Sequence, residues 1–193
     1  MPSITNVYES HWRARKVVSE LEAAGIPSSN ISMLFHKYVS DKPGSGEEAS
    51  ATATGTGVGA VVGGGAGLLA GIGLLVIPGL GPIVAAGWWA PTITGVLAGG
   101  ATGGIVGALV ESGVSEDHAH VLSEAVRRYG TLVSVRFDSS QATTVRSILD
   151  RHEPADPDRL GKEYGQTGWK RFDPAGAPFE LSEEELERRR GLR

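Results

Sequence analysis

The hydrophobic pattern at the start of the chain predicts a strand, a helix and a second strand. Ser3–Tyr8 (SITNVY) is short and rich in β-prone residues, which is typical of a strand. From about Ser10, apolar residues recur at helical spacing until Gly25, where a helix is expected to end. Ile31–His36 (ISMLFH) is again strand-like. The first part of the chain is therefore expected to form a β-α-β unit.

The pattern returns near the other end of the chain. Ser115 is a good helix cap, and Thr131–Phe137 (TLVSVRF) alternates in a way that suits a sheet buried on one face. A further helix is expected over Ser140–His152, and a short edge strand near Ala155–Arg159. The expected fold class is therefore α+β, a ferredoxin-like βαβ…αβα(β) sandwich with helices on one face of the sheet.

The last part of the chain predicts a short charged helix. Ser182 and Glu185 have the spacing of a capping box, and the segment ends in Arg188, Arg189 and Arg190. A solvated helix is the simplest interpretation, and a docking segment for a neighbouring subunit is the alternative.

Between these charged parts lies a long neutral block. Residues 49–110, 62 in all, contain no Asp, Glu, Lys or Arg, and they hold 18 of the 28 glycines. The mean hydropathy of the whole chain, −0.07, conceals this division. The expected organisation is thus 1–48 and 111–160 as two halves of one α+β domain, 49–110 as an insertion, and 161–193 as a tail.

The glycines of the block recur at every fourth residue, which predicts two helices that pack closely through a glycine stripe. A turn signal, Ile77 to Pro82 (IPGLGP), separates the two runs, so a helical hairpin is expected. Glycine costs about 0.8–1 kcal/mol relative to alanine in a helix, and close backbone approach would offset that cost. The candidate packing residues are Gly55, Gly59, Gly63, Gly67, Gly71, Gly95, Gly99, Gly103 and Gly107.

Two environments fit such a hairpin. Val58–Ile77 and Thr92–Val110 are long enough to cross a bilayer as helices, with Trp88 and Trp89 at the membrane interface. The flanks lack a positive-inside bias, however, and the stripe leaves modest lipid-facing hydrophobicity. The alternative is a soluble homo-oligomer whose hairpins form its core, because an exposed block of this size would be an unusually large apolar patch.

Composition narrows the function classes. The net charge is −4 without a basic stripe, which argues against a nucleic-acid partner, and the absence of cysteine excludes thiol chemistry. No secretory signal is evident at the N-terminus, so a cytoplasmic, membrane-associated location is expected. No catalytic residue and no cofactor are expected. Weak metal-ligand candidates share one predicted helix, and a small-ligand or metal-binding regulatory domain is the remaining alternative. These candidates are Glu116, His118, His120 and Glu124.

Four sequence segments carry a family resemblance. They are ITNVYES…ARKVVSELEAAGIPSSNIS, GAGLLAGIGLLVIPGLGPIVAAGW, GALVESGVSEDHAHVLSEAVRRYGTLVSVR and GWKRFD. Together they resemble the bacterial general stress protein family (17M-like, with a heat-induced YflT-type domain), over roughly Ile4 to Asp173. The resemblance implies a stress-induced bacterial protein, often described as a membrane protein, and no catalytic residue. The expected function is a non-enzymatic stress-response protein that self-associates and contacts or inserts into membrane lipid through the glycine-striped hairpin.

Overall fold

The computed structural model describes residues 1–40, 72–77, 80–89 and 104–191. The N-terminal β-α-β unit is confirmed. It consists of β1 (Ser3–Tyr8), α1 (His11–Ala23) and β2 (Ile31–His36), and a short helix α2 (Lys37–Ser40) follows. Ser10 caps α1 by accepting a hydrogen bond from the backbone N–H of Arg13, 3.4 Å away.

The C-terminal half supplies one strand and five helices. They are α4 (Gly104–Glu111), α5 (Glu116–Arg127), β5 (Thr131–Arg136), α6 (Ala142–Arg151), α7 (Pro157–Gln166) and α8 (Glu183–Arg190). Ser115 caps α5 as predicted, and α8 begins with the predicted capping box of Ser182 and Glu185. The dipole-matched charges of α8, three acids in the first turn and three arginines in the last, are also present.

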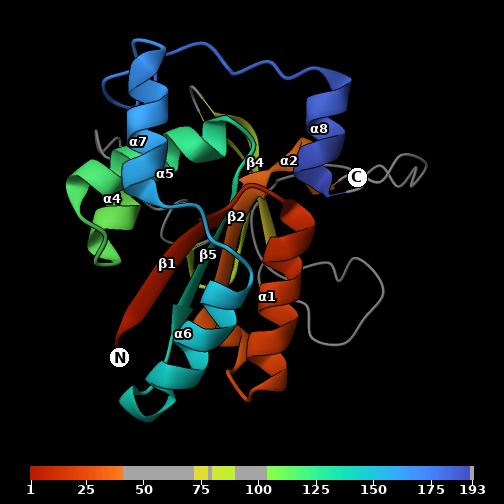
Figure 1. Ribbon diagram of the computed structural model, residues 1–193, viewed down its shortest axis with the longest axis vertical. Helices are drawn as coiled ribbons and strands as arrows, with labels where there is room; N and C mark the ends of the chain where they lie inside the picture. The colour runs from red at the N-terminus through yellow and green to blue at the C-terminus, as the bar shows by residue number, and fades with distance from the viewer. Residues whose placement is uncertain (41–71, 78–79, 90–103, 192–193) are drawn as a thin grey trace.

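The neutral block contributes two strands to the sheet. They are β3 (Ile72–Ile77) and β4 (Gly81–Ala86), which pair antiparallel with Ile77 opposite Gly81. The sheet order is β1-β5-β2-β4-β3, and every neighbouring pair is antiparallel. The fold is therefore a mixed α+β fold built on one antiparallel sheet (Figure 1). Two strands of this sheet, β3 and β4, come from the inserted neutral block.

Helices cover both faces of this sheet, so the expectation of helices on one face is wrong. α1 and α6 pack together over one face, where they form the α1-side core with Val133 and Val135 of β5. α5 lies over the other face with α4 and α7, and Leu34 and Leu132 point into this α5-side core (Figure 1). Alternate strand residues thus enter opposite cores.

Two polar residues on β5 explain the error. Ser134 and Arg136 made one side of the strand look solvent-facing. Ser134 is fully buried, and its hydroxyl hydrogen-bonds the Thr5 hydroxyl of the neighbouring strand at 2.9 Å. The Arg136 guanidinium lies over the Trp88 ring, 3.6 Å from its centroid. Ser134 therefore finds its partner within the protein, whereas Arg136 stays exposed with its guanidinium stacked on the Trp88 ring.

Within the described residues, the first helix of the predicted hairpin is wrong, whereas α4 (Gly104–Glu111) confirms a helix at the end of the second. Ile72–Ile77, the end of the first predicted helix, is strand β3, and the predicted turn therefore joins two strands. The last six residues of the predicted span Val58–Ile77 form strand β3, and residues 58–71 lie outside the described residues. In the second predicted helix, Ile105 and Leu109 of α4 are buried in the α5-side core.

Among the described helices, none is long and apolar enough to cross a membrane. The predicted edge strand near Ala155–Arg159 is reduced to a single bridge between Ala155 and Val7. Helix α7 follows instead, because Asp156 caps it and Pro157 occupies its first turn, where proline is favourable.

Candidate functional site

Of the paired tryptophans, Trp89 belongs to the protein interior and Trp88 is partly buried beside it. Trp89 is 1% exposed and packs in the α5-side core, and its backbone N–H donates to the Ser32 hydroxyl at 3.3 Å. Trp88 packs against the same core, under the guanidinium of Arg136. The assignment of Trp89 to a membrane interface is therefore wrong, because the indole is enclosed by the chain's own helices and strands.

Of the nine stripe glycines, Gly107 is the one that the structure describes, and the other eight lie outside the described residues. Gly107 lies in helix α4, and a Cβ placed there would meet no atom within 4 Å. Among the described residues, Gly107 therefore makes no close helix contact of the kind that the stripe predicted.

The four metal-ligand candidates do not converge. Glu124 is fully buried and is paired with Arg127 and Arg128, at 2.6 and 2.8 Å. The His118 ring lies 3.0 Å from Asp158, on α7. Glu116 and His120 both contact the guanidinium of Arg171. Among the residues that the structure describes, no cluster of three or more His, Asp or Glu could hold a metal ion.

The outer side of β3, which we call the β3 edge, is the first region of functional interest. β3 has the sequence IGLLVI, and within the described sheet it hydrogen-bonds to β4 alone. A strand edge without charged residues or proline presents unpaired backbone groups that can template pairing with another strand.

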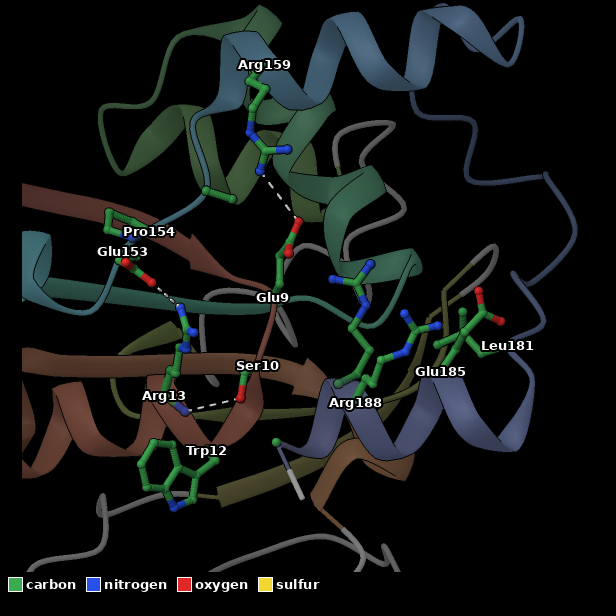
Figure 2. Close-up of a pocket in the computed structure, with 13 residues that line it drawn as sticks. Glu9, Ser10, Trp12, Arg13, Glu153, Pro154, Arg159, Leu181, Glu185 and Arg188 are labelled. Carbon is green, nitrogen blue, oxygen red and sulfur yellow. Dashed lines mark hydrogen bonds and ion pairs between the residues drawn. The ribbon is translucent and has the colours of Figure 1, made fainter. Parts of the chain in front are cut away.

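The second region is a charged cleft of about 720 Å³, which we call the arginine cleft. It lies where the end of β1 and the start of α1 face the turn between α6 and α7 and the helix α8 (Figure 2). Four arginines line it, together with three glutamates and an exposed tryptophan. These residues are Arg13, Arg159, Arg188, Arg189, Glu9, Glu153, Glu185 and Trp12.

Two ion pairs cross the arginine cleft. Arg13 Nη1 of α1 lies 2.6 Å from Glu153 Oε2, and Arg159 Nη2 of α7 lies 3.5 Å from Glu9 Oε1 (Figure 2). The carboxylate of Glu185 accepts hydrogen bonds from the backbone N–H and the hydroxyl of Ser182, which lower its pKa. Each of the three glutamates therefore already has a partner.

Helix α8 brings the other two arginines to the cleft. Its end is fixed against the frame, because Arg190 Nε donates to the carbonyl oxygen of Tyr38 at 2.9 Å. Gly191 follows with φ of 84°, and a Cβ there would lie 2.5 Å from the Ser10 hydroxyl, so glycine permits this close approach to α1. Among the described residues, no carboxylate lies within ion-pair distance of Arg188 or Arg189.

Two buried histidines lie near the same end of the sheet. Burial, together with the smaller effect of the Arg15 charge, lowers the pKa of His11 to about 4. Burial lowers the pKa of His36 to about 4 as well. A hydrogen bond with the backbone of Leu80 raises this pKa and so partly opposes the effect of burial. The His36 ring packs on Tyr129, with centroids 4.2 Å apart. Both imidazoles are therefore neutral packing groups at pH 7.

Sequence reasoning identified the three arginines at the end of α8 but not the cleft that they help to form. Arg159 was placed at the end of an edge strand. The Asp156-Pro157 pair is the local signal that would have placed Arg159 in the first turn of a helix.

Comparison with known proteins adds no relative. No protein-family model matches the chain. The curated proteins and the solved structures give no match either.

Proposed function

We propose that this protein is a non-enzymatic stress-response protein that works by self-association, with two copies joined through the β3 edge. The observation that carries the proposal is an uncharged six-residue strand, β3, at the edge of the described sheet. The stress role rests on the family resemblance, and the mode of association rests on the edge.

A second copy is the occupant that fits this edge. β3 is antiparallel to β4, and a twofold axis would place β3 antiparallel to β3 of a second copy, continuing the pattern of the sheet. The neutral sequence IGLLVI sets no like charges against each other across that axis. Protein edges that avoid such pairing usually carry lysine, proline or an inward-pointing charge, and β3 has none of these.

The proposed frame is a variant of the ferredoxin-like sandwich. Its support is that β5 lies between β1 and β2, which run parallel to each other, and that Ala155 bridges to Val7 on the outer side of β1. The β3–β4 hairpin would then extend the sheet on the opposite side, where a second copy joins.

Size-exclusion chromatography with light scattering on the full chain tests the association. We expect a concentration-dependent dimer, and Leu74→Lys should shift it to monomer because the edge then carries a charge. Val110→Lys is the matched control, since Val110 lies exposed on α4 and is 42% accessible. A wild-type chain that remains monomeric at all concentrations would contradict the proposal and favour residues 41–71 of the same chain as the cover.

Hydrogen exchange gives a second measurement that needs no variant. The outward amides of β3 should exchange faster when the wild-type protein is diluted from dimer to monomer. The amides of β1, at the other side of the sheet, should not change. Protection in β3 that does not depend on concentration would argue against the second copy.

A further inference from the structure

The arginine cleft contains two arginines that pair with no described carboxylate, and its lining has a net formal charge of +1. Its four arginines face three glutamates, of which Glu9 pairs with Arg159 and Glu153 pairs with Arg13. The third glutamate caps α8 through its hydrogen bonds to Ser182. The guanidinium groups of Arg188 and Arg189 are what remains, because no described carboxylate lies within ion-pair distance of either.

The chemistry of these two groups indicates a tetrahedral oxyanion. A guanidinium donates two parallel hydrogen bonds in a planar fork, which matches phosphate or carboxylate oxygens. A phosphate monoester offers three acceptor oxygens to the two guanidinium forks, whereas a carboxylate offers two, and the charge of the monoester, about −1.5 to −2 at pH 7, strengthens the attraction. The cleft therefore suits a phosphate dianion better than a carboxylate.

The size and remaining lining of the cleft indicate that the phosphate belongs to a small organic molecule. Its volume of about 720 Å³ lies within the range of about 300–1,000 Å³ that is typical of small-molecule sites. Trp12 lines the cleft and is 52% exposed, with the Lys16 ammonium 4.6 Å from its ring centroid, so the exposed part of its indole offers an apolar surface to the organic part.

An extended polyanion fits the same cleft poorly. Glu9, Glu153 and Glu185 are distributed around its wall and would repel neighbouring phosphates of a nucleic acid (Figure 2). The chain as a whole has a net charge of −4, which also opposes nucleic-acid binding.

We propose that the arginine cleft binds a small organic phosphate, whose phosphate group is held by Arg188 and Arg189 and whose organic part lies next to Trp12. Helix α8 is then a ligand-binding element, and its attachment to Tyr38 and Ser10 positions the two arginines. This site is separate from the β3 edge and does not depend on self-association.

Isothermal titration of the full chain with phenyl phosphate, inorganic phosphate and benzoate tests the proposal. We expect saturable binding of phenyl phosphate, weaker binding of inorganic phosphate, and the weakest binding of benzoate. The affinity for phenyl phosphate should fall with added salt, because the interaction is between charges near the surface. Trp12→Ala should weaken phenyl phosphate more than inorganic phosphate.

The decisive variant is Arg188→Gln with Arg189→Gln, which should weaken phenyl phosphate by at least about tenfold. Arg146→Gln with Lys170→Gln is the matched control, because it removes two exposed positive charges outside the cleft and should change the affinity by less than about twofold. Circular dichroism would verify that both variants are folded. Absence of saturable binding to the wild type, equal binding of benzoate, or equal loss in both double variants would overturn the proposal.

Discussion

The β3 edge and the arginine cleft are two surface regions that differ in the chemical groups they offer to a partner. The edge is uncharged and offers backbone hydrogen-bonding groups, whereas the cleft is crowded with charges and offers two guanidinium groups. The edge comes from one continuous segment, and the cleft combines residues that are up to 182 positions apart, from Glu9 to Gly191. An uncharged edge is suited to a like partner, and a charged cleft is suited to a ligand of opposite charge.

The comparison also divides the neutral block itself. Leu80, Ile83 and Trp89 are as well buried as residues of the charged frame, so the β3–β4 hairpin is part of the core and not an appendage. The hairpin contributes to both cores, because Ala86 packs on the α1 side of the sheet. The following predictions test this division, from the largest expected effect to the smallest.

The largest expected contrast in the free energy of unfolding is between Trp89, which follows β4, and Trp12, which lines the arginine cleft. Trp89→Ala removes an indole that is 1% exposed and should lower the free energy of unfolding by about 3–5 kcal/mol. Trp12→Ala, in the cleft, should change it by about 0.5 kcal/mol or less because that side chain is 52% exposed. Urea denaturation measures both. Equal losses would contradict the distinction between a structural hairpin and a cleft open to ligand.

A pair of glycines tests the contact between the hairpin and the frame. Gly87 has φ of 79°, and a Cβ there would lie 2.1 Å from the carbonyl oxygen of Ile31, so Gly87→Ala should cost about 3 kcal/mol or more. Gly25 has a similar φ of 86° but an open surrounding, so Gly25→Ala should cost about 1–2 kcal/mol. The difference between the two, from denaturation midpoints, isolates the close approach of β4 to β2.

His36 lies where the frame meets the hairpin, and it predicts a pH dependence. Its pKa is lowered from 6.5 to about 4 in the folded protein, so the unfolded chain binds more protons between these values. The free energy of unfolding should therefore decrease as the pH falls from 6.5 to 4, with about 1–2 kcal/mol of the loss due to this histidine. His36→Phe should reduce the slope by that amount, since the ring contact with Tyr129 remains possible. An unchanged slope would contradict the assignment.

The frame could be predicted from sequence because its signals are local. Strand residues at Ser3–Tyr8 and Ile31–His36 are bounded by turns, helical spacing placed α1 after Ser10, and the capping residue Ser115 placed the start of α5. The β3–β4 hairpin was misassigned because a short apolar run such as IGLLVI fits a buried helix or a strand equally well by spacing. The hairpin joins the sheet through the pairing of β4 with β2, and a contact between such distant segments is not visible in a local sequence pattern.

The arginine cleft could not be predicted for a different reason. Its charges were all visible in the sequence, but their pairing depends on how α1, α7 and α8 come together in space. Arg13 pairs with Glu153, 140 positions away, whereas Arg188 has no described carboxylate within ion-pair distance although Glu185 lies one turn before it. Counting charges along the chain therefore gives the composition of the cleft but not which charges remain available.

The smallest expected effect on the free energy of unfolding comes from Gly107 of the glycine stripe. The sign of this effect shows whether a second copy packs against α4 at that glycine. Gly107 lies inside α4, and a Cβ there would meet no atom of the described chain within 4 Å. If nothing else packs on it, Gly107→Ala should raise the free energy of unfolding by about 0.5–1 kcal/mol, since alanine favours the helix. If a helix of a second copy lies against Gly107, the added methyl group should instead weaken the dimer. Denaturation at low and high protein concentration separates these outcomes, because a packing penalty would grow with the fraction of dimer. Stabilisation at both concentrations would confine self-association to the β3 edge.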